Sequence, residues 1–233
     1  DSLSVRSIAE DKEGRVYLAT THGMAYVGED GKLNKVDEPQ INDEYIRELE
    51  LGDDDVIYGI TMNNAIFTMK DASVTGFYDA AKLGISNART ICPDKNNPGY
   101  LYVGTNETDI YYGTLNGGFK REGYNDEGEL LCINSVAEID DGLWFCADNG
   151  IGVRRNGKLH ILDSVPMNSS VEDIMVDYQG NVWFVSSQQG VMKIVRNQFT
   201  NIFDKYQLEN EVVYSTCIVD HMLFGIFHPQ PIV

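Results

Sequence analysis

The sequence repeats a pair of short apolar segments joined by a turn, and this repeat constrains the fold more than any other feature. The clearest copy is residues 171–184, where Val-Glu-Asp-Ile-Met-Val leads through Asp-Tyr-Gln-Gly-Asn into Val-Trp-Phe. Two apolar runs around a turn that contains Asp and Gly indicate a β-hairpin, and the second run carries an aromatic residue. Further copies begin near residues 5, 46, 88, 133 and 213.

The aromatic residues of the second run give the period of the repeat. They lie 41, 44, 42, 39 and 41 residues apart, at Tyr17, Tyr58, Tyr102, Trp144, Trp183 and Phe224. A period of about 40–45 residues, with four strand signals and no helical pattern, is typical of one propeller blade. The sequence therefore predicts an all-β fold, a β-propeller of four-stranded antiparallel blades.

The same period sets the blade boundaries within one repeat domain, residues 1–233. We expect blades at residues 4–43, 44–86, 87–131, 132–169 and 170–210, and a partial blade at 211–233. Pro229 and Pro231 interrupt the later strands of the last copy, because proline cannot donate to a sheet ladder. About five and a half blades are therefore expected. We interpret the chain as a segment of a larger propeller, and the alternative is an irregular six-blade ring.

Charge makes two classes of partner unfavourable. The net charge is −18, with 36 acidic against 18 basic residues. Such a surface repels phosphate backbones and anionic lipids, so we expect no nucleic-acid partner and no membrane-surface partner. No apolar stretch reaches the length of about 18 residues that a membrane span requires, so no direct membrane insertion of this segment is expected.

The four cysteines do not predict a metal site. Cys92, Cys132, Cys146 and Cys217 form no CxxC pair and no zinc spacing. Cys146 and Cys217 fall on predicted strands, where cysteine usually behaves as a small buried apolar residue. Asp53-Asp54-Asp55 lacks the ligand spacing of a calcium loop and aligns with the first turn of the other copies. No metal and no cofactor are predicted, and the disulfide status stays open.

Blade geometry predicts where a ligand binds. In an antiparallel meander, the start of the first strand and the turn between the second and third strands lie at the same end. With the first strand innermost, side chains at its second position and in that turn gather at one mouth of the central channel. The strand positions are Arg6, Arg47, Arg89, Asn134, Glu172 and Tyr214. The turn positions are His22, Asn64, Asn106, Asn149 and Gln189.

Three arginines in this predicted ring favour an anion or a polar sugar as the ligand. The alternative is that each arginine pairs with a nearby carboxylate, such as Glu48 or Glu172, and closes the channel.

The repeats resemble those of the two-component regulator propeller family. Its repeat has an apolar residue, Ser-Ile, an Asp, a Gly, an apolar-aromatic pair, Gly-Thr and a further Gly. Residues 5–24 match it through Val5, Ser7, Ile8, Asp11, Gly14, Val16, Thr20 and Gly23, with Tyr17 in place of Trp. Residues 171–191 match it through Val171, Ile174, Asp177, Gly180, Val182, Trp183, Gly190 and Val191, and residues 101–105 read Leu-Tyr-Val-Gly-Thr.

The resemblance implies an extracytoplasmic sensor region of a membrane-anchored bacterial signalling receptor. We expect a non-catalytic, ligand-sensing propeller module that binds a small polar ligand, such as an oligosaccharide or an anion. The implied partners are downstream signalling domains of the same full-length chain. Exposed terminal blades are also compatible with a homodimer.

Two other functions stay open. One is a lyase resembling the streptogramin-inactivating propellers, which depend on a histidine base and a carboxylate-held magnesium ion. Of the four histidines, only His22 falls on the predicted channel face, with no acidic partner in its turn. The other is a protein-interaction scaffold, which predicts a large apolar surface patch.

Overall fold

The computed structural model of the chain describes residues 4–125, 128–140, 142–195, 213–220 and 222–227. It divides into two compact units, residues 1–194 and 195–233, which are described separately. The first unit contains five antiparallel sheets and the second contains one hairpin. Whether both belong to one repeat domain, as the sequence predicts, stays a prediction.

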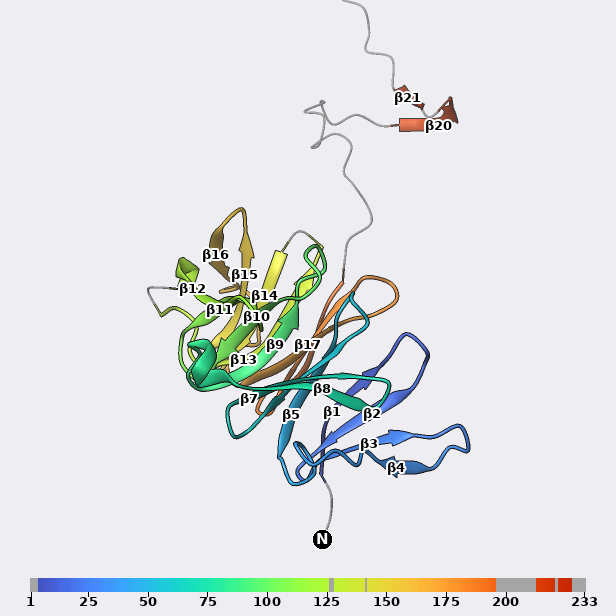
Figure 1. The fold of residues 1–233 in the computed structure, drawn as a ribbon. Helices are drawn as coiled ribbons and strands as arrows, with labels where there is room; N and C mark the ends of the chain where they lie inside the picture. The colour runs from blue at the N-terminus through green and yellow to red at the C-terminus, as the bar shows by residue number, and fades with distance from the viewer. Residues whose placement is uncertain (1–3, 126–127, 141, 196–212, 221, 228–233) are drawn as a thin grey trace, which may run out of the picture. The chain divides into compact units, whose positions relative to one another are not determined.

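Four sheets of the first unit are four-stranded, and in each of them consecutive strands pair (Figure 1). The first two sheets comprise β1 (Val5–Glu10), β2 (Val16–Thr20), β3 (Met24–Val27), β4 (Leu33–Lys35), β5 (Ile46–Leu51), β6 (Ile57–Thr61), β7 (Ala65–Lys70) and β8 (Ser73–Asp79). The next two comprise β9 (Ala88–Pro93), β10 (Tyr100–Thr105), β11 (Ile110–Thr114), β12 (Gly118–Glu122), β13 (Ile133–Ile139), β14 (Gly142–Ala147), β15 (Gly150–Arg155) and β16 (Lys158–Ile161). Short 3₁₀ helices at Ala80–Leu83 and Gly123–Asn125 follow β8 and β12.

The fifth sheet comprises β17 (Val171–Val176), β18 (Val182–Ser186) and β19 (Gly190–Ile194). Residues 196–210 of this predicted blade, where a fourth strand is expected, lie outside the described residues. The second unit is a hairpin of β20 (Val213–Val219) and β21 (Met222–Phe227).

The expected propeller of antiparallel blades is therefore confirmed, but the blade count is corrected. Five blades form the first unit, where the sequence predicted about five and a half or an irregular six. The difference arises because the sixth copy of the repeat contributes its hairpin to a separate compact unit.

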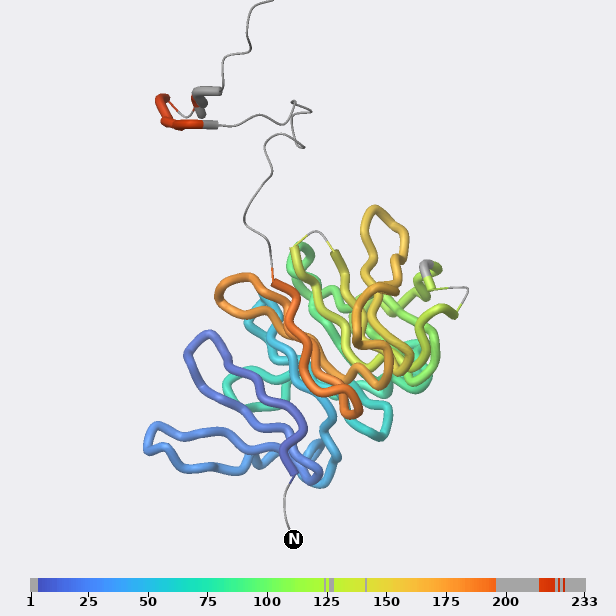
Figure 2. The backbone as a smooth tube through the Cα atoms, turned by 180° about the vertical axis from the view of Figure 1, so that it is seen from behind, coloured from blue at the N-terminus to red at the C-terminus, as the bar shows by residue number. Residues whose placement is uncertain are grey.

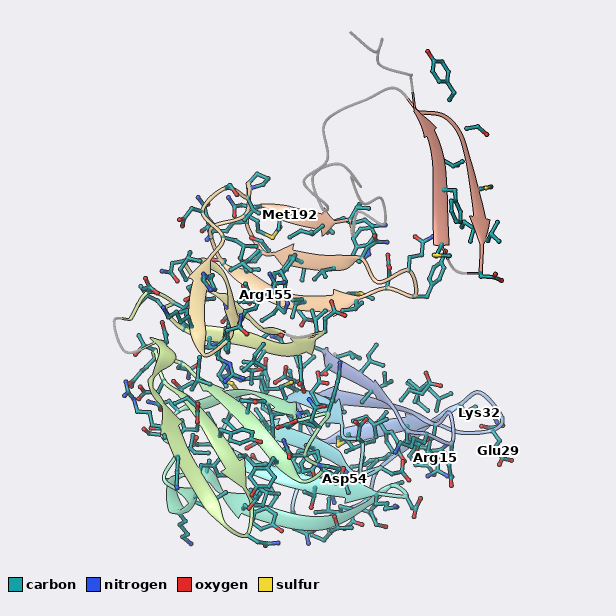
Figure 3. The ribbon with its side chains drawn as sticks, turned by 90° about the horizontal axis from the view of Figure 1, so that it is seen from above. Arg15, Glu29, Lys32, Asp54, Arg155 and Met192 are labelled. Carbon is teal, nitrogen blue, oxygen red and sulfur yellow. The ribbon has the colours of Figure 1, made fainter. Side chains whose placement is uncertain are left out.

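The blades follow one another around a centre, as the tube in Figure 2 and the view from above in Figure 3 show. Four buried apolar clusters hold them together, and each cluster joins two consecutive blades. One example is the contact of Tyr17 and Met24 of the first blade with Ile46 and Phe67 of the second. Strands β6 and β14 are buried on both faces, which confirms that the blades stack face to face. Burial of apolar area at about 25 cal/mol per Å² is the main stabilising contribution.

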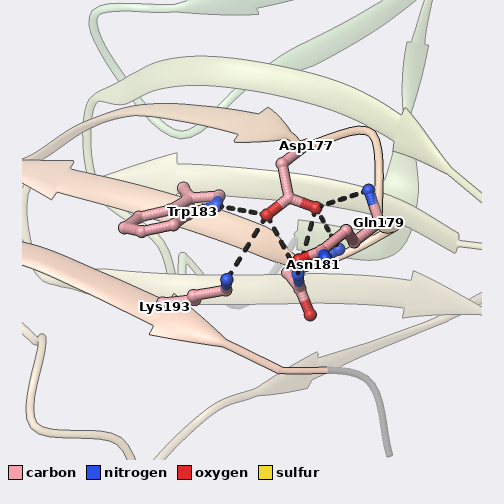
Figure 4. Close-up of polar contacts among 5 residues, drawn as sticks. All are labelled: Asp177, Gln179, Asn181, Trp183 and Lys193. Carbon is pink, nitrogen blue, oxygen red and sulfur yellow. Dashed lines mark hydrogen bonds and ion pairs between the residues drawn. The ribbon is translucent and has the colours of Figure 1, made fainter. Parts of the chain in front are cut away.

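A hydrogen bond fastens the repeated aromatic residue to the turn before it. The carboxylate of Asp177 accepts from the indole Nε1 of Trp183 at 2.9 Å (Figure 4). Asp54 accepts from the hydroxyl of Tyr58 at 2.5 Å, and Asp11 accepts from that of Tyr17 at 3.0 Å. The Asp side chain thus links the turn to the second strand in three of the five blades.

The glycine of the Asp-x-x-Gly turn has a left-handed backbone, with φ of 83° at Gly14 and 80° at Gly180. Glycine adopts this conformation without steric cost. Each glycine N–H donates to the carbonyl oxygen of the turn's Asp, at 3.0 Å to Asp11 and 2.9 Å to Asp177. The Asp-x-x-Gly spacing recurs in the repeat because this turn geometry requires an Asp at its first position and a Gly at its fourth.

Two blades depart from this arrangement. In the third blade, the longer turn brings Asp94 to the hydroxyl of Tyr112, at 2.6 Å, in place of Tyr102. In the fourth blade, Ile139 pairs directly with Gly142, so the turn has only two residues. The Nε1 atom of Trp144 is buried there without a hydrogen-bond partner among the described residues.

The cysteines are free thiols. Cys146 is buried as predicted, and burial raises the pKa of its thiol. The prediction for Cys217 is wrong, because this residue is exposed on β20. Within the described part of the chain, no helix has the length and apolar character needed to cross a membrane.

Candidate functional site

The first strand of every repeat contains a β-bulge at its second residue. In β1, Val5 pairs with Thr20 and Ser7 pairs with Ala19, so Arg6 has no partner in the ladder. The same irregularity leaves out five further residues, namely Arg47, Arg89, Asn134, Glu172 and Tyr214. A bulge takes the extra residue out of the ladder and re-aims its side chain. The six strand positions predicted from the repeat therefore share one backbone geometry.

Five of these six side chains line a central cavity of about 810 Å³, whose lining residues come mainly from the innermost strands of the five blades. They are Arg6, Arg47, Arg89, Asn134 and Glu172. This volume lies in the range of small-molecule sites, about 300–1,000 Å³. Tyr214 belongs to the second unit, in which its side chain is exposed.

Two arginines in this cavity share one acceptor. The guanidinium groups of Arg47 and Arg89 donate to Oδ1 of Asn106, at 3.4 Å and 3.0 Å. Arg47 also donates to the sulfur of Met62, and its buried Nε has no partner among the described residues. Burial and the neighbouring charge of Arg89 lower the pKa of Arg47. Two positive charges are thus held side by side.

The alternative prediction, that arginine–carboxylate pairs close the channel, is not met among the described residues. Within the described residues, Arg6, Arg47 and Arg89 form no ion pair. Glu48 instead accepts from the Thr90 hydroxyl, and Glu172 accepts from the Ser187 hydroxyl. Arg6 lies over the ring of Tyr45, 5.6 Å from its centre, which is within the range of a cation–π contact.

The predicted turn residues have different surroundings. Only Asn106 reaches the arginines. Asn64, Asn149 and Gln189 accept hydrogen bonds from the backbone N–H groups of Ala88, the first residue of β9, and of Leu131 and Asn168, which lie in connections between blades, each at 2.8 Å. His22 contacts the Thr21 hydroxyl, 3.1 Å from its Nδ1. None of the five is among the residues that line the cavity.

These side chains have a structural explanation. The N–H groups of Leu131 and Asn168 lie outside the sheets and that of Ala88 lies at the first residue of a strand, and such groups require acceptors. The amide side chains of Asn64, Asn149 and Gln189 supply those acceptors.

The sequence analysis named Glu48 only as an ion-pair partner of the arginines, and it missed Glu50 and Asp173. Glu48 and Glu50 from β5 and Asp173 from β17 line it together with the arginines. Burial, followed by the charge of Glu50, raises the pKa of Glu48. Burial and the charge of Asp173 raise the pKa of Glu50 to about 7, although Lys95 lowers it. One signal in the sequence could have found two of these carboxylates. The third residue of the inner strand is a hydroxyl residue in three blades, at Ser7, Thr90 and Ser135, but a carboxylate in the other two, at Glu48 and Asp173.

Side chains at this third position connect neighbouring inner strands. The Ser7 hydroxyl oxygen accepts from the backbone N–H of Leu49 at 3.1 Å, and Glu48 accepts from that of Ile91 at 2.9 Å. The Ser135 hydroxyl donates to Asp173 at 3.0 Å. These bonds fix the spacing of the cavity wall below the bulges.

A second cavity of about 350 Å³ lies between the third and fourth blades. Two of its three acidic side chains already accept hydrogen bonds: Asp94 accepts from Tyr112 and Asn97, and Glu138 accepts from the Lys95 backbone and Asn96. The hydrogen bonds of Asp94 and Glu138 in the wall of this cavity hold the long turn of the third blade in place. Across the described ranges, no group of three His, Cys, Asp or Glu side chains is placed to hold a metal ion.

No protein-family model and no curated sequence matches the chain. Its fold is nevertheless shared with solved propellers. One is the extracellular domain of BT3049 from B. thetaiotaomicron, assigned to a hybrid two-component system, with 17% identity and a TM-score of 0.66 over 82% of this chain. Another is the extracellular domain of BT4673 from the same organism, with 19% identity and a TM-score of 0.63 over 92% of this chain.

A third similar structure is an enzyme, the gluconolactonase XC5397 from Xanthomonas campestris. It is 11% identical, with a TM-score of 0.62 over 81% of this chain and 71% of its own. The matches define the class of protein as a β-propeller, a fold found here both in receptor ectodomains and in an enzyme. The chain spans 28% and 31% of the two B. thetaiotaomicron chains.

Proposed function

We propose that this chain is a non-catalytic, ligand-sensing propeller module of a bacterial signalling receptor. The small polar ligand binds in the central cavity through Arg6, Arg47 and Arg89. The observation that carries the proposal is the pair Arg47 and Arg89, whose guanidinium groups meet at one neutral amide oxygen and form no ion pair with a carboxylate of the described residues.

An anionic group on the ligand fits this arrangement. Guanidinium groups form short, charge-assisted and often bidentate hydrogen bonds to carboxylates, sulfates and phosphates. An anion between Arg47 and Arg89 would relieve their mutual repulsion and give the buried Nε of Arg47 a partner. An acidic sugar of an oligosaccharide satisfies the same requirement.

The similarity to receptor ectodomains supports a location of the module outside the cytoplasm, as part of a longer receptor chain. We place it outside the cytoplasm, in a longer membrane-anchored chain with downstream signalling domains. The ligand acts by shifting an equilibrium between conformations, or between monomer and homodimer, that it binds unequally.

Thermal shift and titration calorimetry with glucuronate, citrate and sulfate test the proposal, with glucose as the uncharged comparison. We expect an anion to raise the melting temperature of the wild type. The double variant Arg47→Ala/Arg89→Ala loses this shift, whereas Lys120→Ala, which removes an exposed charge from β12, keeps it. Unchanged anion binding in a folded double variant would overturn the proposal. Conversion of the bound ligand during incubation would overturn its non-catalytic part.

One observation favours a second candidate, a protein-interaction scaffold. Ile8 and Met175, from the first and fifth inner strands, are 63% and 60% exposed and lie at the rim of the same cavity. Exposed apolar side chains near one another are typical of interaction sites. If this role holds, Ile8→Glu/Met175→Glu abolishes self-association or partner binding in analytical ultracentrifugation while anion binding persists.

A further inference from the structure

The central cavity has two ends of opposite charge on a single strand. Arg47 and Glu50 both belong to β5, and both line the cavity. Glu50 lies three positions after Arg47, and a strand advances about 3.3 Å per residue, so their backbone positions lie about 10 Å apart. A ligand in this cavity therefore meets a cationic site and an acidic site in succession.

The cationic end presents unused donors. Asn106 is the shared acceptor of Arg47 and Arg89, and it is neutral. The buried Nε of Arg47 has no partner among the described residues. A carboxylate here would accept from both guanidinium groups.

The acidic end presents unused acceptors. No described residue donates a hydrogen bond to the carboxylate of Glu50, whereas Glu48 is occupied by Thr90 and Ile91. Across the cavity, Oδ1 of Asp173 accepts from Ser135 and from the backbone of Ile174, and no described donor contacts its Oδ2. Lys95 is the cation that acts on Glu50, but its ammonium group donates to the backbone oxygen of Glu138.

We infer that the cavity binds a zwitterion whose anionic group lies at Arg47 and Arg89 and whose ammonium group lies at Glu50 and Asp173. A short linear peptide with free termini has this chemistry. The inference rests on the proposed function of the same cavity and specifies the class of its ligand.

The distance between the two ends of the site determines which zwitterions can bind to both. In a free α-amino acid the two charged groups are attached to one carbon, so it cannot reach both ends. An extended chain covers about 3.3–3.6 Å per residue, so a tripeptide places its terminal charges about 7–10 Å apart. The apolar rim at Ile8 and Met175 offers contacts for the side chains between them.

Titration calorimetry on the full chain tests the inference with four probes that have the same number of backbone atoms between the terminal nitrogen and the terminal carboxyl carbon. They are Ala-Ala-Ala, its N-acetyl form, its C-terminal amide, and 8-aminooctanoate. The last has the same two terminal charges as the tripeptide but no peptide groups between them. We expect acetylation and amidation each to weaken binding at least tenfold. Binding of 8-aminooctanoate as tight as that of the tripeptide would assign recognition to the charges alone.

Variants separate the two ends of the site. Glu50→Gln should reduce the preference for the free amine over the acetylated peptide, with little effect on the preference for the carboxylate over the amide. Glu122→Gln, a carboxylate of the second cavity, is the matched control and should change neither. Arg47→Ala/Arg89→Ala should remove the preference for the carboxylate.

The outcomes distinguish the two proposals. Equal affinity for the free and the acetylated peptide, or no effect of Glu50→Gln, would overturn the zwitterion and leave the anion site standing. Failure of all four probes in a protein that still binds a simple anion would have the same meaning. Loss of every arginine-dependent response would overturn the proposed function itself.

Discussion

The indole N–H of Trp183 donates to Oδ2 of Asp177 at 2.9 Å and joins the returning strand of the fifth blade to the turn before it (Figure 4). The other oxygen of the same carboxylate accepts from the backbone N–H groups of Gln179 and Asn181, each at 2.9 Å. The ammonium group of Lys193 lies 3.4 Å from Oδ2. Turn and aromatic residue are therefore fixed by a single side chain. The hydrogen bonds from Trp183, Asn181 and Gln179 hold the pKa of Asp177 well below its usual range.

Replacement of Asp177 by Asn should lower the urea midpoint of unfolding at pH 7. A carboxyl with a lowered folded-state pKa stabilises the protein above its unfolded pKa of about 3.9, and this contribution is lost as the pH falls below that value. The difference between wild type and variant should therefore shrink between pH 5 and pH 3. Asp30→Asn, in an exposed turn where Asp30 accepts from Lys32, is the control and should have a smaller effect. Equal midpoints at pH 7 would contradict this role of Asp177.

The two tryptophans should respond differently to replacement by phenylalanine. Trp183→Phe removes a hydrogen bond to a charged acceptor, whereas Trp144→Phe removes a buried donor without a described partner. A hydrogen bond to a charged acceptor contributes more than one between neutral groups, so we expect Trp183→Phe to cost more stability than Trp144→Phe. Urea unfolding followed by circular dichroism measures both. The opposite order would show that packing of the larger ring outweighs the hydrogen bond.

Glu48 should tolerate Gln but not Ala. Its carboxylate accepts from the backbone N–H of Ile91 at 2.9 Å and from the Thr90 hydroxyl at 3.1 Å. Glu48→Ala leaves both donors without an acceptor, at a cost of about 1–3 kcal/mol, whereas the amide oxygen of Gln retains one. Ser7→Ala, which removes the acceptor of the Leu49 N–H, should cost less, because its partner bond is neutral. Similar midpoints for Glu48→Ala and Glu48→Gln would count against this connection.

Stability should fall as the pH rises through the range in which Glu50 ionises. Burial and the charge of Asp173 raise the pKa of Glu50 from 4.5 to about 7, and the charged groups that act on it are Asp173, Lys95 and its coupled neighbour Glu48. Between these two pKa values the folded state binds more protons than the unfolded state, so the free energy of unfolding decreases with increasing pH.

Glu50→Gln removes this dependence. Between pH 5 and pH 8, its stability relative to wild type should rise by on the order of 1–2 kcal/mol, below the full value of the shift because the side chain also faces the solvent of the cavity. Guanidinium chloride titrations at both pH values measure the change, with Glu122→Gln as the matched variant. Parallel pH profiles for wild type and Glu50→Gln would refute the assignment.

The blade architecture could be predicted because its determinants are local and repeated. The spacing from Tyr17 to Trp183 and the Asp-x-x-Gly turns each require only one hairpin, so each copy carries the full signal. The blade bounds follow, since β13 to β16 lie within the predicted blade 132–169 and β17 to β19 lie within the predicted blade 170–210. Phe224 in the sixth copy is exposed within its hairpin, whereas Tyr17 and Tyr58 are buried. The repeat predicts that each copy forms a pair of strands. Whether the aromatic residue of a copy is buried depends on the blades that pack against it, which the repeat itself does not specify.

The candidate site was predictable only in part. Arg6, Arg47 and Arg89 were found because the second strand position can be aligned across copies. The chemistry around them depends on contacts between blades, which no single repeat contains. The sequence could not show that Asn106 accepts from two arginines, or that Asn64 and Asn149 support the connections. Glu50 was missed because its significance comes from Asp173, more than 120 residues away in the sequence.

The bulge at the start of each inner strand has a consequence for how such a chain diversifies. A residue outside the ladder can be exchanged without a change in the hydrogen bonds on either side of it. Arginine, asparagine and glutamate already occupy this position in different blades on the same backbone geometry. The selectivity of the cavity can therefore evolve by single substitutions, one blade at a time, while the scaffold that presents them stays constant.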